Sequence, residues 1–315
     1  MFSKYRYVYA IYREGNFTKA AQKLFISQPS LSVAIQNIEK KVGAPLFDRS
    51  GAKIELTEIG REYIAAAEQI IRTEQEFSKR IHDIYGLETG ELSVGGTNYL
   101  CSYVLPRIMN RFASRYPKIN VTLVEGNSEN LRQMIEREEL DIVIDSFEED
   151  MQTLQGFPLV SEKILLCVPS ERPINRELMQ YRISPDSIYS GAIDLDAVSS
   201  VPIQRFQNED FVLLKSGNDM FKRAMKIFNN GNVTPRVQFS VDQLNISFAL
   251  AESGMASCFA TDTLFKYGVF HDHVALYRVG EEHGNRMLYI AHKKNRYCTT
   301  AMSEFIRMAV EEIHQ

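Results

Sequence analysis

The stretch from Asn16 to Gly60 constrains the fold of this 315-residue chain more than any other part of the sequence. It holds two short segments of helical periodicity only a few residues apart, which predicts two helices joined by a tight turn. Thr18 is expected to cap the first helix, because its hydroxyl group can accept a hydrogen bond from a free N–H of the first turn. Ser27 offers the same cap to the second helix, and Pro29 suits the first turn of that helix.

The second helix is expected to have one buried and one exposed face. At about 100° per residue, a buried stripe forms from Leu31, Ile35, Ile38 and Val42. The second helix of a helix-turn-helix unit can enter the major groove of DNA, where glutamine binds adenine and serine contacts any base. The candidate DNA-contacting residues of the two helices are Thr18, Ser27, Gln28, Pro29, Ser30, Ser32, Val33 and Gln36.

Residues 45–56 predict a two-stranded wing after the second helix. Ser50 and Gly51 are suited to the turn between the strands. Arg49 and Lys53 flank this turn, and we expect both side chains to contact DNA phosphates.

The whole stretch resembles the winged helix of LysR-type transcriptional regulators, which implies binding to double-stranded operator DNA. The family's hallmarks are present as Ala20, Ala21, Ser27, Gln28, Pro29, Leu31, Ser32, Ile38, Glu39, Gly43, Leu46, Phe47, Arg49, Leu56, Thr57 and Gly60. Val33 departs from the family pattern, which usually has a basic residue after the Leu-Ser pair. If Val33 faces the groove, a guanine-reading side chain is replaced by one that suits a thymine methyl group.

The distribution of charge favours DNA binding by one end of the chain. Residues 1–60 contain nine basic and five acidic residues, a net charge of +4, whereas the whole chain carries −4 and the remainder therefore −8. A basic head on an acidic body is typical of a protein that contacts nucleic acid through the head alone.

A cytoplasmic location without a membrane partner is expected. No apolar run approaches the ~18 residues of a membrane span, and the N-terminus lacks the pattern of a signal peptide. The four cysteines have neither paired nor metal-type spacing, which is typical of a reducing compartment. They are Cys101, Cys167, Cys258 and Cys298. A redox switch at Cys101 is kept as an alternative.

Residues 57–85 predict one long helix, because they contain no proline and only one glycine, Gly60, in the first turn. Its apolar stripe needs a partner, and an antiparallel copy of the same helix is the simplest one. The family uses this segment as its dimerisation helix. We therefore expect a homodimer through residues 58–86, with tetramers formed by contacts between the bodies.

The body alternates strands and helices, which predicts an α/β fold with parallel strands covered by helices. Its order resembles the effector domain of the LysR family, which is similar to periplasmic binding proteins and has two α/β lobes joined by two crossings. The crossings are expected near Glu162–Leu165 and Thr263–Tyr267. The expected domains are a winged helix-turn-helix at 1–58, a linker helix at 59–89, lobe I at 90–163 and 266–315, and lobe II at 164–265.

Polar residues follow several of the predicted strands, where ligands bind in open α/β sheets. By the family resemblance, contacts to a small-molecule effector are expected at Thr97, Asn98, Tyr99, Leu100, Ser128, Ser146, Lys215 and Ser216. Hydroxyl groups, free backbone N–H groups and one lysine suggest an anionic effector, although Asp145 argues mildly against a strongly anionic one. Ser128 could equally well serve only as the N-cap of the helix that follows, and Asn127 is the other candidate for this cap. No cofactor or metal is expected.

The sequence favours a LysR-type transcriptional regulator, with RNA polymerase as a further expected partner. The sequence contains no phosphate-binding loop and no nucleophile-elbow motif, so no motif predicts an enzyme. The alternative is a cytoplasmic solute-binding or enzymatic α/β protein whose helical head only oligomerises it. A third hypothesis is another winged-helix regulator whose acidic body binds a protein. Residues 170–210 receive no function beyond an edge of lobe II.

Overall fold

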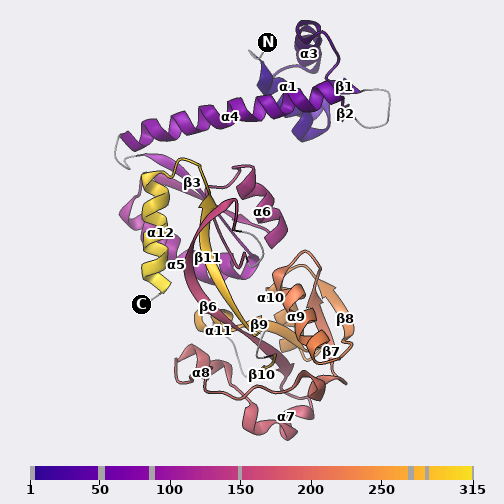
Figure 1. The fold of residues 1–315 in the computed structure, drawn as a ribbon, viewed down its shortest axis with the longest axis vertical. Helices are drawn as coiled ribbons and strands as arrows, with labels where there is room; N and C mark the ends of the chain where they lie inside the picture. Colours follow the sequence, from indigo (N-terminus) through magenta and orange to yellow (C-terminus); the bar gives the residue numbers. More distant parts are fainter. Residues whose placement is uncertain are drawn as a thin grey trace. The chain divides into compact units, whose positions relative to one another are not determined.

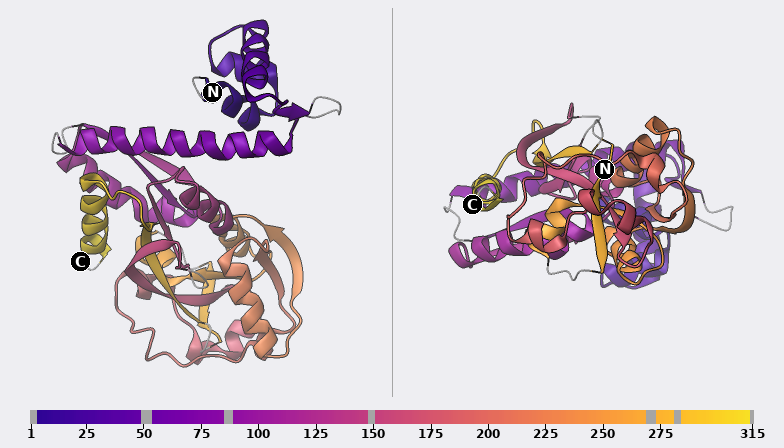
Figure 2. Two further views of the ribbon diagram at one scale, coloured as in Figure 1. Left: turned by 45° about the horizontal axis from the view of Figure 1, so that its top comes forward. Right: turned by 90° about the horizontal axis from the view of Figure 1, so that it is seen from below.

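The computed structural model describes residues 4–48, 54–84, 89–147, 151–268, 273–280 and 284–313. The chain divides into two units, Met1–Ile81 and His82–Gln315. Figure 1 labels the elements, and Figure 2 shows the same ribbon from two further sides. Within the described ranges, no helix is both long and apolar enough to span a membrane.

The first unit contains three short helices, a small β-wing and most of a long helix. These elements are α1 (Tyr5–Glu14), α2 (Phe17–Lys23), α3 (Gln28–Val42), β1 (Phe47–Asp48), β2 (Glu55–Leu56) and α4 (Glu58–Ile84). The strands β1 and β2 pair in antiparallel fashion, as the wing requires. The turn between them, with Arg49 and Lys53, lies outside the described residues.

Asn16 caps α2, so the expected cap at Thr18 is wrong. The Asn16 backbone is extended, and its side-chain oxygen accepts hydrogen bonds from the N–H groups of Thr18 at 2.8 Å and Lys19 at 3.1 Å. Thr18 is the second residue of the helix, and its own backbone N–H group needs a hydrogen-bond acceptor. The cap at Ser27 is confirmed, because its hydroxyl oxygen accepts from the N–H of Ser30 at 3.2 Å.

Two side chains connect the wing to its neighbouring helices. Glu39 of α3 accepts a hydrogen bond from the N–H of Leu46 at 2.9 Å. Thr57 donates to the carbonyl oxygen of Pro45 at 2.8 Å and accepts from the N–H of Gly60 at 2.9 Å, which begins α4. The wing is therefore fixed between the end of α3 and the start of α4.

The second unit begins with a lobe in which strands alternate with helices. Its elements are β3 (Gly90–Gly96), η1 (Leu100–Val104), α5 (Leu105–Arg115), β4 (Ile119–Glu125), α6 (Ser128–Glu136), β5 (Ile142–Asp145) and the C-terminal α12 (Thr300–Ile313). The central strand β3 runs parallel to β4 on one side and to β5 on the other. The predicted parallel arrangement is thus confirmed for β3, β4 and β5, whereas the strand at 285–293 pairs with β5 in antiparallel fashion.

The long strand β6 (Leu154–Pro169) runs through both lobes, and a second long strand, β11 (Asn285–Lys293), lies beside its first part (Figures 1 and 2). The N-terminal part of β6 pairs with β11 as far as Lys163. Its C-terminal part pairs with two strands of lobe II, β9 (Cys258–Thr261) and β10 (Val274–Arg278). The chain therefore enters lobe II near the residues expected for the first crossing.

The return crossing lies between β10 and β11, so its expected position at Thr263–Tyr267 is wrong. Those residues belong to the helix α11 (Asp262–Tyr267). The physical reason is the pairing of β10, which follows α11 and still bonds to the lobe II part of β6, with Val274 opposite Pro169.

The rest of lobe II contains one parallel strand pair and several helices. These elements are α7 (Ile174–Glu177), η2 (Met179–Tyr181), α8 (Pro185–Tyr189), η3 (Ile203–Phe206), β7 (Asp210–Leu214), α9 (Asp219–Asn230), β8 (Arg236–Val241) and α10 (Leu244–Glu252). The segment 170–210 lies along β10, where Ile183 pairs with Leu276 and the N–H of Val201 donates to Arg278 at 2.8 Å. It covers an edge of lobe II, as expected.

Candidate nucleic-acid interface and ligand cleft

The predicted faces of α3 are confirmed by the burial of its side chains. Leu31 and Ile35 are fully buried, whereas Val33 is 56% exposed. Val42, expected in the buried stripe, is only half-buried at the last turn. The exposed residues of the helix include Gln28, Pro29, Ser30, Val33, Gln36 and Lys40.

The polar groups at the start of α3 hold one another in place. The Ser27 and Ser30 hydroxyl groups are 2.7 Å apart, and the Gln28 amide donates to the Ser32 hydroxyl at 2.9 Å. The side chain of Gln36, one turn further on, makes no hydrogen bond within the part of the chain that the structure describes. Its amide group is therefore available to the edge of a base.

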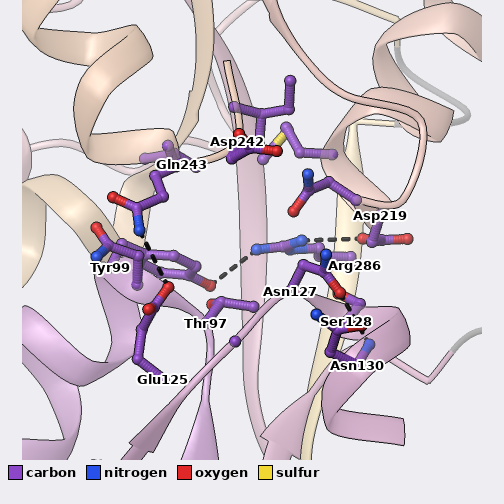
Figure 3. Close-up of a pocket in the computed structure, with 16 residues that line it drawn as sticks. Thr97, Tyr99, Glu125, Asn127, Ser128, Asn130, Asp219, Asp242, Gln243 and Arg286 are labelled. Carbon is purple, nitrogen blue, oxygen red and sulfur yellow. Dashed lines mark hydrogen bonds and ion pairs between the residues drawn. The ribbon is translucent and has the colours of Figure 1, made fainter. Parts of the chain in front are cut away.

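A cavity of about 360 Å³ lies between the two lobes (Figure 3). Lobe I lines it with the ends of β3 and β4 and the start of α6, and lobe II with the starts of α9 and α10. The lining residues are Thr97, Asn98, Tyr99, Glu125, Gly126, Asn127, Ser128, Asn130, Leu214, Asn218, Asp219, Met220, Asp242, Gln243, Leu244 and Arg286. We call this cavity the cleft.

Arg286 of β11 connects both lobes at the base of the cleft. Its guanidinium group donates to Glu162 at 2.6 Å, to Tyr99 at 2.8 Å and to Asp219 at 2.9 Å. Burial lowers the pKa of Arg286, but the carboxylates of Glu162 and Asp219 outweigh this effect and raise its pKa well above the usual value. The guanidinium group is thus permanently charged and already paired.

Asp219, at the start of α9, is also ionised and paired. Burial favours its neutral form, but Arg286 and Arg223 outweigh burial and lower the pKa of the carboxyl group. The Arg223 side chain donates to Asp219 at 2.9 Å. Asp145 differs, since burial raises its pKa while Ser128 and the N–H of Ser146 counteract this in part.

The structure brings some of the expected effector residues together and separates others. Thr97, Asn98, Tyr99 and Ser128 all line the cleft. Ser146 and Ser216 line a smaller neighbouring cavity of about 180 Å³, which shares Ser128 and Asp219 with the cleft.

Leu100 and Lys215 are not among the residues that line the cleft, which corrects their expected position. Leu100 is 1% exposed, because it starts η1 with its side chain in the core. Lys215 pairs with Asp242 at 2.7 Å. Asn127, rather than Ser128, caps α6, and its side-chain oxygen accepts from the N–H of Asn130 at 2.8 Å.

Four charged residues of the cleft were not predicted from the sequence, namely Glu125, Asp219, Asp242 and Arg286. Asp219 begins a helix after a strand and Glu125 ends a strand, so the rule that located Thr97 also applies to them. Arg286 has no such signal, because it is the second residue of β11 and does not follow the carboxyl end of a strand.

Neither a thiol switch nor a metal site receives support. Burial raises the pKa of Cys101 to about 11, and its thiol group donates to the carbonyl oxygen of Gly96 at 3.2 Å. Such a thiol is protonated near neutral pH and reacts slowly. Among the described residues, no group of three or more His, Cys, Asp or Glu side chains is placed to hold a metal ion.

Two family models match the chain. The model for "Bacterial regulatory helix-turn-helix protein, lysR family" matches residues 2–61, and the model for "LysR substrate binding domain" matches residues 86–313. A helix-turn-helix head joined to a two-lobed ligand-binding body defines a class of bacterial transcription regulators. The chain belongs to the LysR family, and it is a DNA-binding transcriptional regulator with an effector-binding domain.

Similar proteins cover nearly the full length of the chain. It is 27% identical over 98% of its length to the "Uncharacterized HTH-type transcriptional regulator YcgK" of Bacillus subtilis, of which 94% is covered. A "Probable RuBisCO transcriptional regulator" of Synechocystis is 26% identical, with 96% of this chain and 83% of that protein covered.

Solved structures of the same fold include full-length LysR regulators. CbnR in complex with its target DNA matches with a TM-score of 0.64 at 18% identity, over 99% of each chain. The effector-binding domain of QuiR in complex with shikimate matches with a TM-score of 0.56 at 16% identity, over 72% of this chain and 98% of that one.

Proposed function

We propose that this regulator reads operator DNA with the exposed face of α3 and responds to a small molecule in the cleft. The proposal for DNA rests on Gln36, whose side chain lies exposed at the centre of α3 and has no partner in the described residues. The proposed contacts are Thr18, Ser27, Gln28, Pro29, Ser30, Ser32, Val33 and Gln36, with Arg49 and Lys53 of the wing on phosphates.

The cleft supports a role in binding rather than in catalysis. Its charged side chains are held in ion pairs or hydrogen bonds, as the bonds of Arg286 to Glu162 and Asp219 illustrate. A ligand that contacts both lobes shifts the equilibrium between two arrangements of the lobes only if it binds these arrangements with different affinities. The strands β6 and β11 connect the lobes and are the elements that would transmit this change.

The protein is proposed to dimerise through the exposed apolar surface of α4. Phe77 is 66% exposed and Ile81 38% exposed, and we propose that a second copy of α4 covers them. Contacts between effector domains would then give a tetramer, and RNA polymerase is the proposed partner of the DNA-bound form. The proposed domains are a head at 1–58, a linker helix at 59–89, lobe I at 90–163 and 284–313, and lobe II at 164–280.

The experiment that tests the DNA-binding face is the substitution Gln36→Ala. It is expected to weaken specific binding by about 1–3 kcal/mol and to relax preference at one base position, because an amide-to-base contact is lost. Binding constants and base preferences are measured at fixed salt for both proteins. Gln133→Ala, at an exposed helical glutamine of α6, is the matched control and should behave as wild type. Unchanged base preference in Gln36→Ala contradicts the assigned face.

A further inference from the structure

We propose that the effector carries a protonated amine, and that a zwitterionic amino acid is the class of compound that fits the cleft. This inference rests on the proposed function, since it names the ligand of the same cleft. It departs from the anionic effector that the sequence suggested. Four features of the cleft support it: its occupied cations, a carboxylate without a cation, unsatisfied acceptors, and free N–H groups on the opposite lobe.

The cations near the cleft are not available to an anion. Each of the three guanidinium nitrogens of Arg286 already donates a hydrogen bond, to Glu162, Asp219 or the Tyr99 hydroxyl group, and its side chain is 5% exposed. Lys215, the expected anion-binding lysine, pairs with Asp242 at 2.7 Å. An anionic ligand would have to displace a carboxylate from one of these pairs.

Glu125 provides a negative charge without a cationic partner. It lines the cleft at the end of β4, and its carboxylate accepts only a hydrogen bond of 3.3 Å from the amide of Gln243 (Figure 3). Within the described part of the chain, no lysine, arginine or histidine pairs with it. Of the three carboxylates in the lining, Asp219 is paired with Arg286 and Arg223, and Asp242 is paired with Lys215, so Glu125 is the one left uncompensated. The side chains of the cleft therefore favour a positively charged group.

Unsatisfied acceptors lie beside Glu125. The oxygens Oγ1 of Thr97 and Oδ1 of Asn98 are buried and have no hydrogen-bond partner. Gly96 at the end of β3 is paired with Glu125 at the end of β4, so Thr97 and Asn98 leave the sheet next to that carboxylate. Buried acceptors without a partner are costly, and an ammonium group supplies three donors.

The opposite lobe provides donors for a carboxylate. The helix α10 has no acidic residue in its first turn, and its cap residue Gln243 makes no side-chain cap bond. The first N–H groups of a helix lack internal partners and carry partial positive charge. Leu214, Met220 and Leu244 add apolar surface for a side chain. An amino acid would thus place its amine on lobe I and its carboxylate on lobe II.

The test compares amino acids with the acids that lack only the amine, using the full-length protein. Calorimetric melting suits a chain without tryptophan. The probes are leucine with isocaproate, phenylalanine with hydrocinnamate, and glutamate with glutarate, together with the other common amino acids. We expect at least one amino acid to raise the melting temperature, and its deaminated counterpart to have little effect.

Substitution of Glu125 tests the ammonium contact directly. Glu125→Gln is expected to weaken binding of the active amino acid about tenfold or more, because a charge-assisted contact is lost. Glu91→Gln, at an exposed glutamate of the same lobe outside the cleft lining, is the matched control and should bind as wild type. Glu125 is itself exposed, so its substitution is not expected to impair folding.

Three results would overturn the inference: no amino acid stabilises the protein, a carboxylate without an amine stabilises it equally, or Glu125→Gln binds as wild type. Salt-sensitive DNA binding is measured on the same samples. If it persists, any of these results rejects the amine and leaves the proposed function in place. If the wild-type protein does not bind DNA, the proposed function itself is contradicted.

Discussion

Arg286 is the residue that joins the two lobes most directly. It is 7% exposed, and its guanidinium group contacts Tyr99, Glu162 and Asp219. A buried charge is tolerated only when it is paired and hydrogen-bonded, so removal of Arg286 would leave Glu162 uncompensated in the interior and Asp219 with Arg223 alone. The same pairing removes this side chain from the groups that can bind an effector anion.

The buried carboxyl group of Asp262 makes the free energy of unfolding depend on pH. It is 6% exposed, and burial raises the pKa of its carboxyl group to about 6. The folded state therefore binds this proton more tightly than the unfolded state, and the carboxyl group destabilises the fold as pH rises from about 4 to about 6. Over this range, wild type should lose up to about 3 kcal/mol of unfolding free energy relative to Asp262→Asn.

Urea unfolding of both proteins at several pH values between about 4 and 7 measures this difference. The asparagine keeps the side-chain oxygen that accepts from the N–H of Lys163 at 2.7 Å, so the comparison isolates ionisation. Parallel stability curves for the two proteins would contradict the raised pKa.

At the scale of residues, the sequence predicts what depends on near neighbours. Ser27 was recognised as a cap because the helix it begins follows at once. Asn16 and Thr18 are both residue types that favour the N-cap position, and only the backbone conformation decides between them. Arg286 was missed because its partners Glu162 and Tyr99 are 124 and 187 positions away.

The contact between α4 and the wing depends on the absence of a side chain at Gly60. A Cβ atom at this position would lie 2.0 Å from the carbonyl oxygen of Leu46. Gly60→Ala is therefore expected to destabilise the first unit by about 1–3 kcal/mol, as overpacking does elsewhere. Gly90→Ala serves as the control, since no atom lies within 4 Å of its Cβ position. Denaturant unfolding measures both; equal stability of the two variants would refute the predicted clash.

The exposed apolar surface of α4 predicts self-association. Phe77 lines a groove on this helix together with Ala66, Gln69, Ile70, Thr73 and Glu74. Phe77→Glu should weaken dimerisation at least tenfold, because each buried apolar side chain contributes about 1.5–3 kcal/mol. Sedimentation velocity measures the association constant. Phe25→Glu, at a phenylalanine that is 95% exposed, is the control. Dimers of undiminished stability in Phe77→Glu would exclude this surface as the interface.

Elements with local signals were predicted well, and elements that depend on distant partners were not. The faces of α3 followed from periodicity alone. The N-terminal half of β6 was missed, because Gly156 and Pro158 interrupt it and exposed residues do not alternate regularly. It is a strand because β11, more than a hundred positions later, pairs with it.

At the scale of the whole molecule, the family resemblance predicted the two lobes but not the path between them. Lobe II ends only after β10, because that strand pairs with β6. No short-range pattern marks this pairing, so the second crossing was placed too early. The strand β6, which pairs with strands of both lobes, is where a ligand in the cleft can change the arrangement of the lobes.

The exposed face of α3 predicts sequence-specific DNA binding. The most direct test is selection of bound duplexes from a random-sequence library by the full-length protein at physiological salt. A dimer that inserts two recognition helices should enrich two related half-sites whose centres are spaced by about one helical turn, or a multiple of it. Enrichment of such a motif, with one position relaxed in Gln36→Ala, is the predicted result. Recovery of duplexes without any common motif would contradict it.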